Sequence, residues 1–301
     1  MKRISFRDIG LKYVLSPYDE PVTSVRPGEA IVLEVEDACS GQIRAKGDFR
    51  DRSKIPFSNP VVGPIYVEGA ESGSAISISI QEIKPTTGQG VTYMWEGYLA
   101  GYPVFQFFHT GFPREPRICA IKGGSIHFSD RITIPYRPMV GTIGVAPHPG
   151  AEAISSGVLP GRHGGNMDVP EVSPGSKVLL PVFHRGALLY LGDVHAAQGD
   201  GEIGGSGIEM PADVKISVDL VEETLNWPRI ETDSEVMSVA TTSAGRSFED
   251  TIRTAFVELS LWMERKHGLN RVDALMLCSQ VGRIRVGNLW TVAARIEKKY
   301  C

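Results

Sequence analysis

The sequence has no apolar run long enough to cross a lipid bilayer: its longest runs stay under about ten residues, where a spanning helix needs roughly 18 to 20. Its basic opening, MKRISFRDIG, is not followed by the apolar segment of a signal peptide. Basic residues are not in excess either, because 31 Lys and Arg stand against 35 Asp and Glu, for a formal net charge of -4. Such a balance gives no electrostatic reason to bind nucleic acid. We therefore expect a cytoplasmic protein whose partners include neither a membrane nor a nucleic acid.

Cysteine is scarce, and no two cysteines form a CxxC pair. In a chain of 301 residues, four scattered cysteines are typical of free thiols in a reducing compartment. We expect Cys39, Cys119 and Cys278 to be small buried side chains and Cys301 a loose terminal thiol. There is also no GxSxG segment, so the sequence lacks the nucleophilic serine turn of that hydrolase class.

Turn residues are plentiful, with 33 glycines and 20 prolines spread along the chain between short β-branched runs. This punctuation is typical of many short strands joined by tight turns. Ile76, Ile78 and Ile80 alternate with serines, which is the period of a strand with one buried face. In the first 140 residues we expect strands within 29–38, 63–83, 103–108, 117–128 and 131–140. This N-terminal part is expected to be all β.

Glycine-punctuated loops prevail between residues 141 and 186, and further strands lie within and after them. Segments 177–183 and 187–196 are expected to be two strands joined by the HRG turn at 184–186. Residues 213–223 alternate strongly and predict another strand.

The C-terminal quarter has a helical period. Apolar residues at 248, 252, 255, 256, 259, 262 and 263 recur in steps of three and four, which predicts a helix. Ser247 is a suitable N-cap and Gly268 a suitable stop. A shorter helix is expected from about Asn270, and residues 283–299 are expected to close the chain with a strand.

We therefore predict a mainly β fold, with sandwich-like or barrel-like sheets and a smaller C-terminal α+β portion. Three parts are expected: a β-rich part at 1–140, a β-rich part carrying the motifs at 141–225, and an α+β part at 226–301 packed on the core.

Ionisable chemistry is concentrated in YLGDVHAAQGDGEIGGSGIEM, residues 190–210, directly after an apolar run. Asp193 and His195 are two apart, so on a strand they point the same way. Asp200 and Glu202 repeat that spacing after a glycine turn. An imidazole with two or three carboxylates suits a borderline divalent ion such as zinc. A calcium site and a metal-free acid/base pair remain open as alternatives.

Two further segments add candidate residues. RHGGNMD holds His163, Asn166 and Asp168, and NPVVGPIYVEGAE places Glu68 directly after an apolar strand. The bland alternatives are that His163 is an exposed loop residue and that Glu68 belongs to a solvated turn.

Several of these segments resemble the acetamidase/formamidase family. The resemblance is carried by GTIGVAP, GRHGGNMD and PVFHRGALLYLGDVHAAQGDGEIGGSGIE, with GPIYVEGAE as the upstream block, from about Asn59 to Leu220. It implies hydrolysis of a short aliphatic amide to a carboxylic acid and ammonia, a β-rich fold with a small α/β portion, homo-oligomeric assembly and, in at least some members, a divalent metal. The chain departs from the family at HPG after GVAP and at ESGSA, which puts the substrate in question more than the fold.

The chemistry of amide hydrolysis then assigns roles, because water must be activated, an oxyanion stabilised and nitrogen protonated. His195 and Asp200 are expected as metal ligands, Asp193 as a ligand or as the group that orients the imidazole, and Glu202 as the general base. The backbone N–H groups of Gly164, Gly165 and Asn166 are expected to receive the oxyanion. The pocket is completed by Asn166, Asp168, Glu68, His163 and Gln198.

Two other functions remain open. One is hydrolysis of another small C–N substrate, such as a ureido compound, a cyclic imide or an aromatic amide. The other is a β-protein that binds a small molecule or a metal without turnover.

Overall fold

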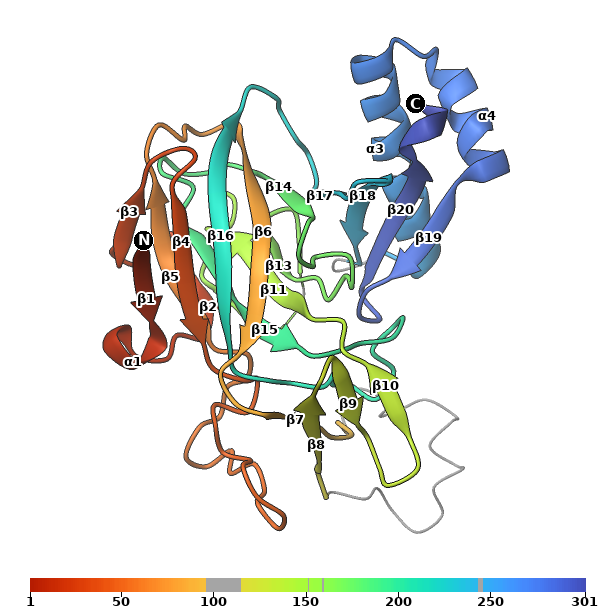
Figure 1. Cartoon of the computed structure of the whole chain (residues 1–301). Helices are drawn as coiled ribbons and strands as arrows, with labels where there is room; N and C mark the ends of the chain where they lie inside the picture. The colour runs from red at the N-terminus through yellow and green to blue at the C-terminus, as the bar shows by residue number, and fades with distance from the viewer. Residues whose placement is uncertain (96–114, 151, 159, 243–245) are drawn as a thin grey trace.

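Strands take up far more of the backbone than helices do in the computed structural model, which describes residues 1–95, 115–150, 152–158, 160–242 and 246–301 (Figure 1). The mainly β fold expected from the sequence is confirmed. The cysteines also lie as expected: Cys39, Cys119 and Cys278 are buried, Cys301 is partly exposed, and all four are free. Within the described ranges, no helix combines the length and the apolar character needed to span a membrane.

The largest sheet has nine strands in the order β1-β4-β16-β6-β14-β17-β18-β20-β19. Its centre is the long antiparallel pair of β6 and β16, in which the alternating isoleucines predicted from residues 75–80 are buried. The bounds are β1 Lys2–Ser5, β4 Ala30–Val35, β6 Ala75–Pro85, β14 Lys177–Pro181, β16 Ala212–Val221, β17 Arg229–Glu231, β18 Glu235–Thr241, β19 Arg283–Val286 and β20 Thr291–Glu297.

A second sheet of five strands carries the functional segments, in the order β13-β11-β15-β5-β3. Every residue of β11 and β15 is buried, because the apolar core lies between this sheet and the first. This core joins Val62, Ile143 and Leu191 of the second sheet to Leu33 and Ile216 of the first. The bounds are β3 Thr23–Val25, β5 Val61–Val67, β11 Met139–Val145, β13 Gly164–Asn166 and β15 Leu189–His195.

Two small sheets complete the β structure of the described part of the chain. A four-stranded meander has the order β10-β9-β8-β7, and β12 pairs with β2. The bounds are β2 Val14–Leu15, β7 Gln89–Thr92, β8 Arg117–Lys122, β9 Ser125–His127, β10 Thr133–Pro135 and β12 Ile154–Ser155.

The C-terminal helices form as the sequence predicts. Helix α3 is Phe248–His267, with the Ser247 side chain accepting from the Asp250 N–H and Gly268 left-handed at its end. Helix α4 is Arg271–Val281, capped by Asn270. The buried face of α3 packs on β18 and β20 around a separate apolar cluster, at the blue end of Figure 1. Among the described residues, two short helices remain: α1 Phe6–Ile9 and the 3-10 helix η2 Lys298–Tyr300.

Three expectations from the sequence are met only in part or lie outside the described residues. The two strands expected on either side of the turn at 184–186 form as β14 and β15, but they lie in different sheets and pair with other strands, so this turn does not close a hairpin. The all-β expectation for the N-terminal part is broken by α1, where Ser5 caps a single turn. The strand expected at 103–108 lies outside the described residues.

The three expected parts share their sheets. The nine-stranded sheet takes strands from 1–140, 141–225 and 226–301, and the boundary at residue 140 falls inside β11. The division at these residues stays a prediction. What positions the site is the second sheet, closed by the C-terminal β19–β20 hairpin (Figure 1).

Candidate active site

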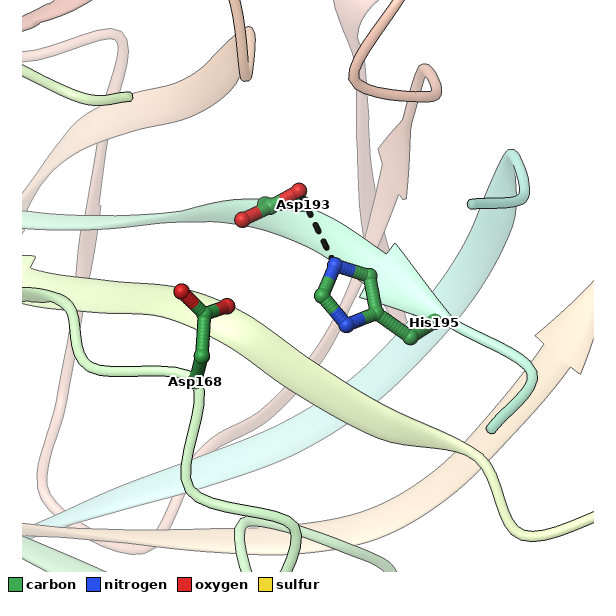
Figure 2. Close-up of side chains that lie close together, drawn as sticks. All are labelled: Asp168, Asp193 and His195. Atoms are coloured by element: carbon green, nitrogen blue, oxygen red, sulfur yellow. Dashed lines mark hydrogen bonds and ion pairs between the residues drawn. The ribbon is translucent and has the colours of Figure 1, made fainter. Parts of the chain in front are cut away.

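Two functional side chains lie at the end of β15, where a fully buried strand meets a glycine loop. Asp193 has a left-handed φ of 58°, which sets its carboxylate beside the ring of His195. Asp193 Oδ1 lies 3.2 Å from His195 Nε2, and Figure 2 shows the two groups side by side. Asp193 and His195 are each 1% exposed, so neither side chain contacts bulk water.

Asp168 approaches this pair from the loop after β13 (Figure 2). Its Oδ2 accepts a hydrogen bond of 2.9 Å from Asn288 Nδ2, while its buried Oδ1 has no hydrogen-bond partner among the described residues. Candidate ligand atoms of Asp168, Asp193 and His195 all lie within 4.8 Å of one another. A buried carboxylate oxygen without a donor is costly unless a cation occupies the space beside it.

A second group of candidate ligands shares His195 and adds Glu202 and Glu209, again within 4.8 Å. Glu209 Oε1 accepts from the Gly207 N–H at 2.9 Å. Its Oε2 lies 3.1 Å from His195 Nε2 but makes no well-aligned hydrogen bond. Four carboxylates thus surround one imidazole.

Gln198 fixes the protonation pattern of His195. Its Nε2 donates to the backbone oxygens of Asp168 (2.7 Å) and Gly287 (3.3 Å), so its Oε1 must face the ring. That oxygen lies 2.9 Å from His195 Nδ1, which therefore carries the proton. Nε2 is then left facing two carboxylate oxygens. A lone pair in that position calls for a proton or a metal ion between the three atoms.

Three carboxyl groups and the imidazole of the cluster have raised pKa values, and the negative charges that lie close together there contribute to each of them. Burial and the charge of Asp193 raise the pKa of Asp168 to about 7. Burial raises the pKa of Glu209 to about 7 as well, and burial together with the charge of Asp168 holds the pKa of Glu202 well above its ordinary value. The carboxylates hold the pKa of His195 well above the usual imidazole range despite its burial. Cations would relieve this arrangement.

A pocket of about 240 Å³ opens onto the cluster, and Asn59, Asn166, Glu202 and Glu209 lie on its lining. Asn166 Oδ1 accepts from Thr142 Oγ1 (2.7 Å) and Asn59 Nδ2 (3.0 Å), which fixes the orientation of the amide. Its Nδ2 donates to none of the described residues, so this N–H is available to a molecule in the pocket. Glu202 likewise makes no side-chain hydrogen bond within the described ranges.

Gly141, in β11, leaves the room that the cluster occupies. A Cβ at this position would lie 2.7 Å from Asp193 Oδ2 and would also collide with Asp168 Oδ1. Only glycine lets this strand pass so close beneath two carboxylates.

The structure brings together six of the residues proposed from the sequence. They are Asp193, His195, Glu202, Asp168, Asn166 and Gln198.

Asp200 does not join the cluster. Its carboxylate is exposed and accepts two hydrogen bonds of 2.9 Å from Arg285 Nη1, so it anchors the glycine loop to β19. Glu68 does not join it either. It is exposed just beyond the end of β5 opposite to Asn59, and a strand of seven residues covers about 23 Å at 3.3 Å per residue.

The glycine segment before Asn166 is also used differently from the expectation. The Gly164 N–H donates to the Gly161 carbonyl oxygen at 3.0 Å, so the fold already uses it, and Gly165 is paired with Ile143 of β11. His163 is 3% exposed and does not line the pocket. Burial and the charge of His148 lower the pKa of His163 to about 4, so this ring is neutral.

Sequence reasoning left three site residues without a role: Asn59, Glu209 and Asn288. Glu209 closes the same glycine block as His195 and pairs with it across an isolated bridge, so its position after the turn was a usable signal. Asn59 precedes β5 and donates to Asp193 Oδ2 at 2.7 Å. Asn288 lies 79 residues after Glu209 (288 − 209), which is the nearest of the other site residues in the sequence, and no motif precedes it, so nothing local identifies it.

Comparison with known proteins shows which family the chain resembles. The family model described as Acetamidase/Formamidase family matches residues 16–153 and 148–254. An acetamidase structure from Yersinia enterocolitica has a TM-score of 0.89 and 34% identity, covering 99% of this chain and 92% of that one. An acetamidase structure from Bacillus halodurans has a TM-score of 0.88 and 30% identity, covering 99% and 98%.

A curated acetamidase from Mycolicibacterium smegmatis is 29% identical over 66% of this chain and 63% of its own length. The chain thus spans about three fifths of the length of the curated relatives that it matches. The family model nevertheless covers most of this chain, including every site residue from Asn59 to Glu209. The chain belongs to the acetamidase/formamidase family.

Proposed function

We propose that this chain hydrolyses the C–N bond of short linear amides, releasing a carboxylate and ammonia. The observation that carries the proposal is the buried cluster of four carboxylates and one imidazole at the pocket of about 240 Å³. The acetamidases among its relatives support the reaction class. A pocket of this volume limits the substrate to a short chain, because long acyl groups would collide with its walls.

We propose further that Asp168, Asp193, His195 and Glu209 hold a divalent metal ion. Two buried carboxylate oxygens, Asp168 Oδ1 and Glu209 Oε2, receive no hydrogen bond from any described residue, and His195 Nε2 faces carboxylates with its lone pair. One nitrogen and several oxygens are a ligand set that zinc accepts, whereas calcium prefers oxygen ligands alone. When bound, such an ion lowers the pKa of water toward about 7 and polarises a carbonyl group.

The chain's own groups perform the remaining work. Asn166 Nδ2 donates to the carbonyl oxygen of the substrate and to the oxyanion that develops from it. Glu202, which faces the pocket and is not held by other side chains, accepts a proton from the attacking water. Its raised pKa suits it to return that proton to the amide nitrogen, since ammonia leaves readily only once nitrogen is protonated. Gln198 and Asn288 hold His195 and Asp168 in place.

The test is ammonia release from formamide, acetamide and propionamide by the purified protein, before and after chelation and again after zinc or calcium is restored. We expect release that is lost on chelation and recovered with zinc. Release that survives complete removal of metal, checked by elemental analysis, would keep the amidase and overturn the metal. If none of the three amides is cleaved by the metal-loaded protein, the proposed reaction is wrong.

A further inference from the structure

Two arginines line the same pocket as the carboxylate cluster. Arg50 and Arg52 belong to the long segment between β4 and β5, and they share the lining with Phe57, Glu202 and Glu209. Tyr93 lines the pocket as well, and its phenol interacts with charges of both signs: burial, Cys39 and Glu209 raise its pKa, and Arg50 lowers it. The pocket lining therefore combines negative charge, from Glu202 and Glu209, with a positive wall formed by Arg50 and Arg52.

Neither arginine is paired with a carboxylate in the part of the chain that the structure describes. Arg50 Nη2 donates to the Phe57 carbonyl oxygen, while its buried Nε has no partner. Arg52 Nη1 reaches only the Pro56 carbonyl oxygen, at 3.4 Å. The contrast with other arginines is clear, because Arg44 and Arg229 each bind two carboxylates.

The two guanidinium groups are also close enough to act on each other. Burial lowers the pKa of Arg52, and the positive charge of Arg50 lowers it further. Arg52 is exposed and Arg50 is partly buried, so water screens part of the repulsion between their charges, and an anion bound between them would remove more of it. A planar fork of N–H donors is the group that best matches a carboxylate.

The volume allows for more than a minimal amide. About 240 Å³ would hold about eight water molecules at roughly 30 Å³ each, which exceeds what formamide or acetamide fills. A four-carbon chain with an amide at one end and a carboxylate at the other is of the right size. Its amide would reach Asn166 and Glu202 while its carboxylate stays at the positive wall.

We propose that Arg50 and Arg52 bind a carboxylate group of the substrate, so that the preferred substrates are half-amides of short dicarboxylic acids. This rests on the proposed amide hydrolysis and names its substrate class. The arginines also offset the repulsion that an anionic substrate meets at the carboxylate cluster. A neutral amide of the same length has no carboxylate for them to bind, so the two arginines would determine substrate specificity.

The test compares succinamate with butyramide, which has the same chain length but no carboxylate, using kcat/KM from ammonia release. The metal-loaded wild type is measured beside Arg50→Gln, Arg50→Lys and Arg52→Gln. Arg26→Gln is the matched control, since Arg26 is an exposed arginine with one long contact of 4.0 Å to Glu29, next to β3. Binding of succinate and of butyrate is measured on the same samples by calorimetry, which reports the anion site without turnover.

We expect the wild type to prefer succinamate, and each glutamine variant to lower the succinamate-to-butyramide ratio of kcat/KM about tenfold or more, as loss of a charge-assisted pair requires. The ratio for Arg50→Lys should lie between those of the wild type and Arg50→Gln, because lysine keeps the positive charge but cannot bind a carboxylate through two parallel N–H groups. Arg26→Gln should leave the ratio unchanged. A ratio near one in the wild type, or one that no Arg50 or Arg52 variant alters, overturns the inference.

The calorimetric arm separates this inference from the proposed reaction. If neither amide is cleaved but succinate binds more tightly than butyrate and Arg52→Gln abolishes the difference, the anion site stands and the reaction fails. If both amides are cleaved but succinate and butyrate bind equally, the reaction stands and the anion site fails. Equal weakening of both carboxylates in the variants would show that the arginines bind the product carboxylate only, which also overturns the substrate class.

Discussion

Glu202 and Glu209 are neighbours in one cluster, yet their surroundings separate their chemistry. Glu209 is 2% exposed and is held by the Gly207 N–H, with its second oxygen aimed at His195. Glu202 follows Gly201 on a turn with a left-handed φ of 45°, and it faces the pocket. A fixed, buried carboxylate suits a ligand, and one that faces the substrate suits a base.

Replacing each of the two by glutamine should therefore give opposite results. Glu202→Gln is expected to lower kcat about 10²–10⁴-fold with metal content retained, because only proton transfer is lost. Glu209→Gln is expected to lower metal affinity, with activity partly recovered in excess metal. Ammonia release and elemental analysis on the same samples check both. Loss of metal in Glu202→Gln would make Glu202 a ligand.

At the residue scale, the sequence was enough to predict Asp193 and His195, but it did not identify the residues that hold them and their neighbours in place. Asp193 and His195 were identifiable because two residues apart on a buried strand share a face. Asp200 has the same spacing from Glu202 but lies beyond a glycine turn, where period-two reasoning no longer holds. The partners Asn59 and Asn288 come from remote segments, and only the fold brings them in.

One element, the glycine loop between β15 and β16, holds Glu202 by its contacts with the C-terminal hairpin. The Gly201 N–H donates to the Val286 carbonyl oxygen at 3.1 Å, and Asp200 binds Arg285 through two hydrogen bonds. Arg285 is in turn fixed by Glu171, 2.6 Å from its Nη2. The proposed base, Glu202, is thus positioned by an ion pair outside the pocket.

Asp200→Asn should loosen this loop without removing a ligand. We expect kcat to fall about threefold to tenfold, as slight misplacement of a catalytic group implies, while metal content stays unchanged. Arg271→Gln is a matched control, because it breaks an ion pair with Glu264, likewise solvent-exposed, between α3 and α4. If Asp200→Asn instead loses its metal, Asp200 is a ligand after all, as the sequence alone indicated.

Elements themselves were easier to predict than their pairing. Helix α3 carries its signals locally, in the stripe, the Ser247 cap and Gly268. Strands β14 and β15 were also found, but their partners β6, β17, β11 and β5 lie far along the chain. A short turn between two apolar runs resembles a hairpin, although here it crosses from one sheet to the other. Nothing in the intervening residues specifies that choice.

On the scale of the whole molecule, the site joins the two apolar cores. Its residues range from Asn59 at the start of β5 to Asn288 in the β19–β20 hairpin, whose strand β20 also packs under α3. Asn288 is fully buried and donates to both the Asp168 carboxylate and the Asn166 carbonyl oxygen. The C-terminal portion therefore contributes to the candidate active site, while the homo-oligomeric assembly and cytoplasmic location stay predictions.

Metal binding should accordingly stabilise the whole chain. At a free zinc concentration of about 100 times Kd the expected gain is about 2.7 kcal/mol, or roughly 5 °C in Tm for a chain of this size. Scanning calorimetry should show a single unfolding transition for the metal-loaded and for the chelated protein, and its Tm should be higher with metal. Asn288→Ala should reduce the shift, because the link between the hairpin and Asp168 is lost, whereas Asn226→Ala, at an exposed asparagine, should not. A C-terminal transition that precedes the main one in the metal-loaded protein, with metal still bound, would show that the hairpin is not part of the site.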